Sequence, residues 1–229
     1  MEPILAWSKE AATHFPDLVV CTGTISDIKF EQHAIMVETL KETVLAKMRR
    51  NYELELLKND AVVRAYRDLY WSLGIDPTKT RPAGEALLRR VLHGDDIPSI
   101  SSVVDAYNLA SLETIIPLSG FDLDRVSLPL EIRFSNESDE FRGIGMNRSI
   151  KFQQKALLIT DTRRILCVYP YRDANFTKIS DETRNVLIVG YGAPGISRDQ
   201  VVDAVKKALT YIKSTAGGIA GIVNVFQPR

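Results

Sequence analysis

The stretch SISSVVDAYNLASLETIIPLSGFDLD, residues 99–124, gives the strongest indication of the fold. Ile100, Val103, Val104 and Leu112 recur at helical spacing, which predicts an amphipathic helix that leads into a strand. Asn108 lies four residues after Val104, so its amide is on the side of the apolar stripe. We therefore expect either a polar pocket behind this helix or an amide that ties the helix end to the sheet.

The whole chain has the composition of an ordinary soluble globular protein. It has 229 residues, of which 45% are hydrophobic and 25% are charged. Lys and Arg together number 29, as do Asp and Glu, so the formal net charge is zero. A neutral chain has no global field that attracts nucleic acid, so any RNA contact must come from a local patch. The N-terminal sequence is unlike a signal peptide and no apolar run has membrane-spanning length, which indicates a cytoplasmic protein without a membrane partner.

The cysteines and histidines do not indicate a metal site or another cofactor. Cys21 and Cys167 are far apart in apolar, strand-like runs, which is typical of buried reduced thiols. His14, His33 and His93 are isolated, without the paired spacing of zinc ligands. We therefore expect a protein that works without a cofactor.

Helical patterns dominate the first half of the chain and strand patterns the second, which predicts an α+β fold. Helical periodicity marks residues 30–59, 62–73, 82–94 and 201–212, besides the helix of the opening stretch. Strand-like runs occur at 17–28, 130–134, 156–160, 165–169, 186–189 and 222–226. No linker interrupts them, so we expect a single domain.

The opening stretch also resembles a known motif. VVDAYN followed by PLSGFDLD is similar to VVD-x-x-N and P-L-H-x-F-D-L-D in the tRNA-binding or editing domain of the phenylalanyl-tRNA synthetase beta chain. Downstream, ISDETRNVLI at residues 179–188 resembles the V-T-D-E-T-K-N-I-L-L of that family. Ile132-Arg133 and the LLITD run at residues 157–161 resemble two further segments. The matches keep their order over roughly residues 80–195, and residues 60–94 look like the helical lead-in of free-standing members.

This resemblance implies a fold and a function. The fold is α+β, with a mixed, mainly antiparallel sheet flanked by helices. Residues 1–229 would form a single editing-type domain, with residues 1–60 as a helical N-terminal elaboration. In the synthetase this domain hydrolyses the ester of a wrongly attached amino acid on tRNA. The chain carries nothing like an aminoacylation domain, so the resemblance implies trans-editing, with tRNA or aminoacyl-tRNA and a small amino acid as partners. The alternative is a module that binds tRNA or an amino acid without catalysis; the oligomeric state is left open.

The chain departs from the family pattern at two places, which involve three residues. Ser119 stands where the family has the His of P-L-H-x-F-D. Val189 and Gly190 stand where the family continues with Glu-Ser. The two most reactive side chains of the synthetase site are therefore replaced in this chain.

The candidate catalytic residues are polar groups within or near the family motifs. Asn108, Ser119 and Thr183 are candidates to orient a water molecule or the ribose hydroxyl of a bound aminoacyl-tRNA. Each also has an ordinary structural interpretation: Asn108 as a loop-tying amide, Ser119 as a turn residue before a strand, and Thr183 as part of a tight bend.

Further residues are candidates for binding. For the substrate they are Asp105, Asp122, Gly143, Gly145, Gly190 and Tyr191. Backbone N–H groups near Gly143 and Gly145 would stabilise an oxyanion, and Tyr191, in a flexible rim, would stack on an adenine. For the RNA backbone they are Arg81, Arg89 and Arg90. The bland alternatives are a tight bend, a strand-to-helix loop and a solvated helix face.

Overall fold

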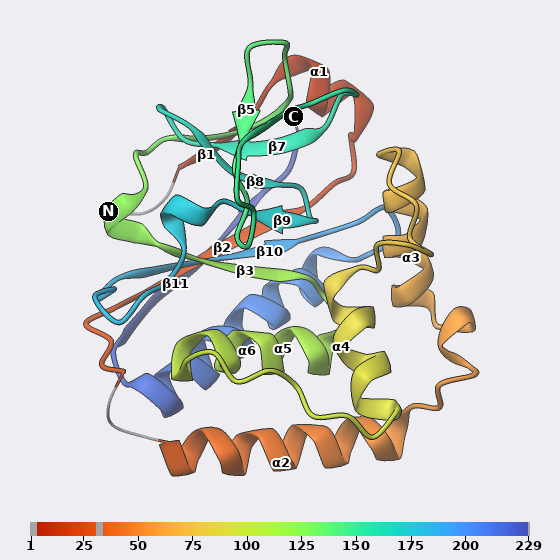
Figure 1. The fold of residues 1–229 in the computed structure, drawn as a ribbon, viewed down its shortest axis with the longest axis vertical. Coiled ribbons are helices and arrows are strands. Elements are labelled where there is room, and N and C mark those ends of the chain that lie inside the picture. Colours follow the sequence, from red (N-terminus) through yellow and green to blue (C-terminus); the bar gives the residue numbers. More distant parts are fainter. Residues whose placement is uncertain (1–3, 31–33, 229) are drawn as a thin grey trace.

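Two sheets and a layer of helices build the molecule, as Figure 1 shows; the computed structural model describes residues 4–30 and 34–228. A five-stranded sheet has the order β1-β4-β7-β8-β9 and a four-stranded sheet the order β11-β2-β10-β3. The first contains β1 (Leu5–Trp7), β4 (Leu130–Phe134), β7 (Leu157–Thr160), β8 (Ile165–Val168) and β9 (Arg172–Asp173). The second contains β2 (Val20–Ser26), β3 (Leu118–Asp122), β10 (Val186–Tyr191) and β11 (Ile219–Phe226). A short hairpin, β5 (Glu140–Phe141) with β6 (Ile150–Lys151), extends from the five-stranded sheet.

The pairing is antiparallel except for β1, which runs parallel to β4. Side chains from both sheets share one hydrophobic core with the helices that cover the four-stranded sheet. This is the mixed, mainly antiparallel sheet flanked by helices that the sequence predicts, so the α+β prediction is confirmed.

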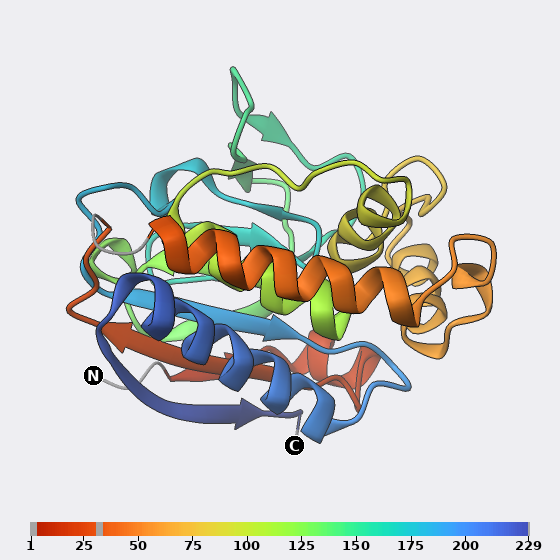
Figure 2. The same ribbon diagram turned by 90° about the horizontal axis from the view of Figure 1, so that it is seen from below.

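The helices are α1 (Lys9–His14), α2 (Ala34–Asn51), α3 (Ala61–Ser72), α4 (Ala83–Leu92), α5 (Ser102–Thr114) and α6 (Arg198–Ala216). As Figures 1 and 2 show, α2, α5 and α6 lie on the face of the four-stranded sheet that is turned away from the five-stranded sheet, whereas α1 lies beside β4. α5 and α6 pack directly on the sheet, and α2 crosses over α5 on the side away from it. Gly190 permits this contact, because a Cβ there would lie only 2.6 Å from Cγ2 of Val205 on α6.

The helix predicted over residues 30–59 is wrong at its C-terminal end. α2 stops at Asn51, and a 3-10 turn at Leu57–Asn59 precedes α3; residues 31–33 lie outside the described residues. Leu57 is fully buried in a cluster with Met48 and Val63, so tertiary packing overrides the helical period here. Asp60 then caps α3 by accepting from the backbone N–H groups at its start.

The N-terminal segment is only partly the helical elaboration that the resemblance implies. Residues 1–60 contribute β1 to one sheet and β2 to the interior of the other, where β2 lies between β11 and β10. The four-stranded sheet therefore cannot form without this segment. Within the described ranges, none of the helices combines the length and the apolar character needed to cross a bilayer.

Candidate active site

Ser119 lies on β3, the edge strand of the four-stranded sheet, and contacts the other sheet. Its Oγ donates a hydrogen bond of 2.7 Å to Oδ1 of Asp173 on β9. Ser119 is only 6% exposed, whereas Asp173 keeps part of its surface open. A buried hydroxyl thus donates to a carboxyl group of the facing sheet, where the two sheets meet.

The environment of Asp173 brings its protonation equilibrium close to neutral pH. Burial raises the pKa of this carboxyl from 3.8 to about 7, against the opposing effect of the hydrogen bond from Ser119. A group that titrates near 7 exchanges protons readily at neutral pH, which is the property of a general base. This is the chemically most capable side chain at the junction of the two sheets.

Two tyrosines and a cysteine complete the surroundings of this pair. The hydroxyl of Tyr191 donates to Sγ of Cys167 at 3.3 Å. Tyr107 of α5 packs on Gly120, where a Cβ would be 2.6 Å from its ring. Burial raises the pKa of both tyrosines, with the Asp173 charge adding to it, so both remain neutral donors. We call the five residues Ser119, Asp173, Tyr107, Tyr191 and Cys167 the edge-strand cluster.

The two positions that depart from the family pattern lie side by side. In the pairing of β3 with β10, Ser119 is directly opposite Val189. Neighbouring strands therefore carry the positions of the family His and Glu, as a shared pocket requires. The carboxylate of Asp173 on the facing sheet contacts Ser119 of this pair.

The polar residues of α5 have different roles. The carboxylate of Asp105 accepts from the backbone N–H of Ile100 at 2.8 Å and from the Ser99 hydroxyl at 2.9 Å. Asp105 thus fixes the segment that enters the helix, which is the structural interpretation. Asn108 is half-buried, and none of the described residues forms a hydrogen bond with its amide.

Thr183 and Asp122 form a separate network at the other end of β3. The hydroxyl of Thr183 donates to Oδ2 of Asp122 at 2.9 Å and accepts from the backbone N–H of Ser180. Arg125 lies 3.3 Å from the same carboxylate oxygen. This network holds the segment before β10 against β3 and does not include Ser119.

The predicted substrate-binding residues Gly143, Gly145, Gly190 and Tyr191 lie in three separate places. Gly190 faces α6 rather than the edge-strand cluster. Tyr191 is the last residue of β10 and is 1% exposed, so its expected place in a flexible rim is wrong: the strand continues through it. The N–H of Gly143 is engaged by Sδ of Met146 at 3.2 Å, and Gly145 lies in the same turn with open space around it.

The predicted RNA-contacting arginines lie around α4. Arg89 donates to Oε1 of Glu85 at 2.7 Å, and the same buried carboxylate is held by Arg67. Arg90 donates to the backbone oxygen of Asp96, and Arg81 is exposed just before the helix. Arg81 and Arg90 thus face solvent, whereas the charge of Arg89 is largely neutralised.

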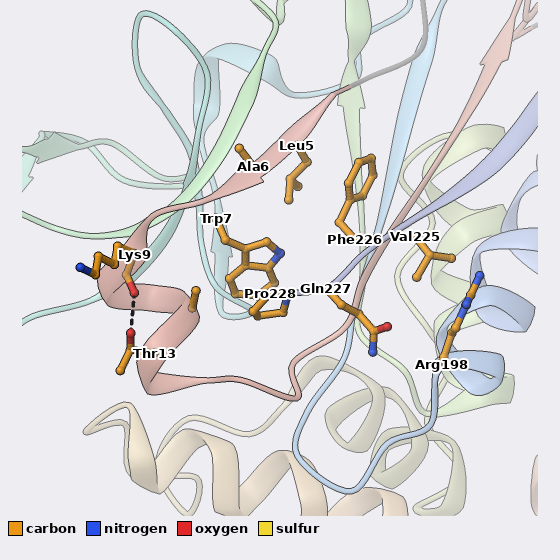
Figure 3. Close-up of a pocket in the computed structure, with 11 residues that line it drawn as sticks. Leu5, Ala6, Trp7, Lys9, Thr13, Arg198, Val225, Phe226, Gln227 and Pro228 are labelled. Atoms are coloured by element: carbon orange, nitrogen blue, oxygen red, sulfur yellow. Dashed lines mark hydrogen bonds between the residues drawn. The ribbon is translucent and has the colours of Figure 1, made fainter.

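A cavity of about 1050 Å³ lies away from these residues, between the first strand and the C-terminal end of β11. Figure 3 shows Trp7 of β1 and Phe226 of β11 in its lining, with Arg198 of α6 to one side. Nε1 of Trp7 is buried without a partner among the described residues. None of the predicted site residues lines this cavity.

Comparison with known proteins explains the motif positions. The model of the B3/4 domain family matches residues 65–217, which is well over half of the chain. The protein belongs to the B3/4 domain family. The match contains α5, β3 and β10, the elements that carry the sequence motifs, as well as Asp173.

The relatives of this B3/4 domain are synthetase subunits. The chain is 24% identical over 176 residues to the phenylalanine–tRNA ligase beta subunit of Pectobacterium atrosepticum, covering 76% of this chain and 21% of that protein. It is 26% identical over 101 residues to the same subunit of Haemophilus ducreyi, covering 44% and 13%. The chain therefore spans about a fifth or less of these relatives.

A solved structure shares the fold. It is an N-terminal fragment of the phenylalanyl-tRNA synthetase beta-subunit from Pyrococcus horikoshii, with a TM-score of 0.51 and 12% identity. The alignment covers 96% of this chain and 50% of the fragment. The predicted resemblance to the synthetase beta chain is thus confirmed in both sequence and fold.

Sequence reasoning missed Asp173 and Tyr107 of this B3/4 domain. Asp173 lies outside the matched motifs, in a two-residue strand, and only the packing of the sheets brings it to Ser119. Tyr107 is part of VVDAYN, but the sequence does not show that its ring packs on Gly120. Asp173 follows the apolar run at 165–168 only after four further residues, so the sequence around it gives no clear signal of a site.

Proposed function

We propose that this B3/4 domain binds aminoacyl-tRNA and hydrolyses the ester of a mischarged amino acid. The names of its relatives link the family to tRNA, which supports a tRNA-related role in general. The observation that carries the hydrolytic step is the 2.7 Å hydrogen bond between Ser119 and Asp173, at the strand position where the related pattern has its His. The pKa of about 7 at Asp173 makes that pair suitable for proton transfer.

In the proposed reaction Asp173 is the general base. Ser119 occupies Oδ1 of the carboxylate, which leaves Oδ2 to accept a proton from a water molecule. The water oxygen bonds to the ester carbonyl carbon while its proton passes to Asp173. The tetrahedral intermediate then breaks its bond to the ribose oxygen, which takes the proton back. The products are the free amino acid and the tRNA with its hydroxyl restored.

Three other side chains have supporting roles in this proposal. The hydroxyl of Tyr107 stays protonated because burial raises its pKa, so it donates to the developing oxyanion. The amide of Asn108, which has no partner among the described residues, binds a ribose hydroxyl or the substrate amino group. Ser119 positions the base rather than attacking the ester, since no described histidine lies beside it to take its proton.

Hydrolysis of charged tRNA tests the proposal. Pools of tRNA charged separately with each amino acid are incubated with the protein, and ester loss is followed against the uncatalysed rate. We expect loss confined to one or a few amino acids, and a decrease of kcat by about 10²–10⁴-fold in Asp173→Asn. Tyr107→Phe should reduce kcat by about 10²-fold.

The matched control is Asp203→Asn, which removes an exposed carboxylate from α6 and should leave the rate unchanged. Ester loss that is equal in wild type and Asp173→Asn would exclude this carboxylate as the base. If no pool is hydrolysed while tRNA still binds, the hydrolytic proposal is wrong. The non-catalytic binding module would then be the correct description.

A further inference from the structure

A second cavity, of about 620 Å³, lies beneath the β5–β6 hairpin on the five-stranded sheet. Aromatic and other apolar side chains make up most of its wall, and Figure 1 shows the hairpin above the sheet. The ring-bearing or flexible members are Phe141, Met146, Phe152, Tyr169 and Tyr171. The volume is in the range of sites that enclose a small planar group.

Phe152 and Tyr171 give this cavity accessible aromatic faces. Phe152 is half-buried and lies 6.2 Å from the buried ring of Phe141, centroid to centroid. Tyr171 is 39% exposed, and the guanidinium of Arg172 lies 5.2 Å from its ring centroid. Rings that are held by packing on one side and open on the other are suited to stacking on a flat ligand.

The cavity lies in the most basic part of a neutral chain. Residues 141–178 contain eight Lys or Arg and only two Asp, although the whole chain has no net charge. Lys151, Lys155 and Arg172 line the cavity itself. Lys155 is paired with Glu10, so Lys151 and Arg172 supply most of the available charge. An anionic ligand with a planar group matches both features.

We propose that this cavity receives an unpaired base of an RNA strand, with the neighbouring phosphates on Arg172 and Lys151. Single-stranded RNA offers the two features together, since every base has a stacking face and every linkage a negative charge. The aromatic lining and the cations of the cavity support RNA binding without reference to hydrolysis. That the strand belongs to an aminoacyl-tRNA rests on the proposed function.

The position of the cavity relates it to the edge-strand cluster. Arg172 and Asp173 are consecutive residues of β9, and side chains alternate between the faces of a strand. Arg172 therefore lines the cavity on one face while Asp173 meets Ser119 on the other. An RNA strand held in the cavity is anchored on the same strand that carries the proposed base.

Fluorescence anisotropy with a labelled, unstructured RNA of about twelve nucleotides tests this inference at low salt. Phe152→Leu keeps an apolar side chain but removes the ring, and we expect it to weaken binding by about 5- to 100-fold. Arg172→Ala should weaken binding and lower the slope of log K against log salt by about 0.7. Lys206→Ala, which removes one exposed charge on α6, is the control and should leave affinity unchanged.

An abasic oligonucleotide of the same length separates stacking from charge alone. It should bind weakly and show no further loss with Phe152→Leu. Absence of RNA binding, or equal affinities for the wild type, Phe152→Leu and Arg172→Ala, would overturn the inference. RNA binding that needs Phe152, without hydrolysis of any charged tRNA, would support this inference and reject the proposed function. Hydrolysis of a charged tRNA with a KM that neither Phe152→Leu nor Arg172→Ala changes would support the proposed function and reject this inference.

Discussion

The carboxyl group of Asp173 should set the pH range of the proposed hydrolysis. Burial raises its pKa to about 7, and only the carboxylate accepts a proton from water. We therefore expect kcat/KM, corrected for uncatalysed hydrolysis, to rise about tenfold per pH unit below about pH 7 and to level off above it. Initial rates between about pH 5 and pH 9 measure this limb. The rise of kcat/KM with pH should be absent in Asp173→Asn. A wild-type kcat/KM that does not change below about pH 7 would contradict the assignment of Asp173 as the general base.

The same residue should destabilise the folded protein at alkaline pH. Because the folded pKa lies above the unfolded value of 3.8, the folded state binds the proton more tightly, and stability falls as pH rises from about 4 to about 7. Asp173→Asn should therefore raise Tm at about pH 8 by about 2–6 °C, and by much less at about pH 5. Thermal unfolding followed by circular dichroism measures both. A lower Tm at both pH values would show that the carboxylate is mainly structural.

At the scale of single residues, sequence motifs gave part of the candidate site but not the carboxyl group of Asp173. Ser119 and Val189 were recognised as departures from a pattern, and their direct pairing follows from strand positions. Asp173 could not be found in this way, because its role depends on how one sheet packs on another. Asp105 was a candidate for substrate binding, whereas its carboxylate accepts from the backbone N–H of Ile100, as carboxylates near a helix start commonly do.

The contact between α3 and α4 depends on one buried carboxylate. Glu85 is 1% exposed and is held by Arg67 at 2.6 Å and by Arg89 at 2.7 Å. Burial raises the pKa of Glu85, but the hydrogen bonds and charges of the two arginines together lower it by more. The pKa of Glu85 is therefore below its ordinary value. Glu85→Ala leaves two cations without their partner and should reduce the free energy of unfolding by about 3 kcal/mol near pH 7. Urea unfolding measures the loss.

The pH dependence and a matched control test this assignment. A carboxylate with a lowered folded pKa stabilises the fold above its unfolded pKa, and this contribution is lost as pH falls through the folded pKa. The difference between the wild type and Glu85→Ala should therefore shrink in strong acid. Glu182→Ala breaks an exposed ion pair with Arg125 and should cost less than about 1 kcal/mol. If Glu85→Ala and Glu182→Ala reduced the free energy of unfolding equally, the buried carboxylate of Glu85 would contribute no more stability than an exposed one.

At the scale of elements, periodicity placed the helices and strands well where one face meets the core. The strand pair predicted at 156–160 and 165–169 is the β7–β8 hairpin, and the last helix is α6. The error at residues 30–59 has a physical cause, because helical propensity continues through residues that the fold needs in a turn. The pairing of strands from distant segments was not predicted, because periodicity describes one segment at a time and the resemblance implied only a mixed, mainly antiparallel sheet.

At the scale of the molecule, we propose that residues 1–229 unfold as one cooperative unit. A single core joins both sheets with α5 and α6, and β2 connects the N-terminal segment to the sheet interior. In a Trp71→Phe variant, Trp7 is the remaining tryptophan and reports on β1, whereas far-ultraviolet circular dichroism reports mainly on the helices. The two urea transitions should coincide, since neither layer keeps a complete core without the other. An earlier transition of Trp7 would instead mean that the five-stranded sheet, and with it Asp173, separates from Ser119 before the helices unfold.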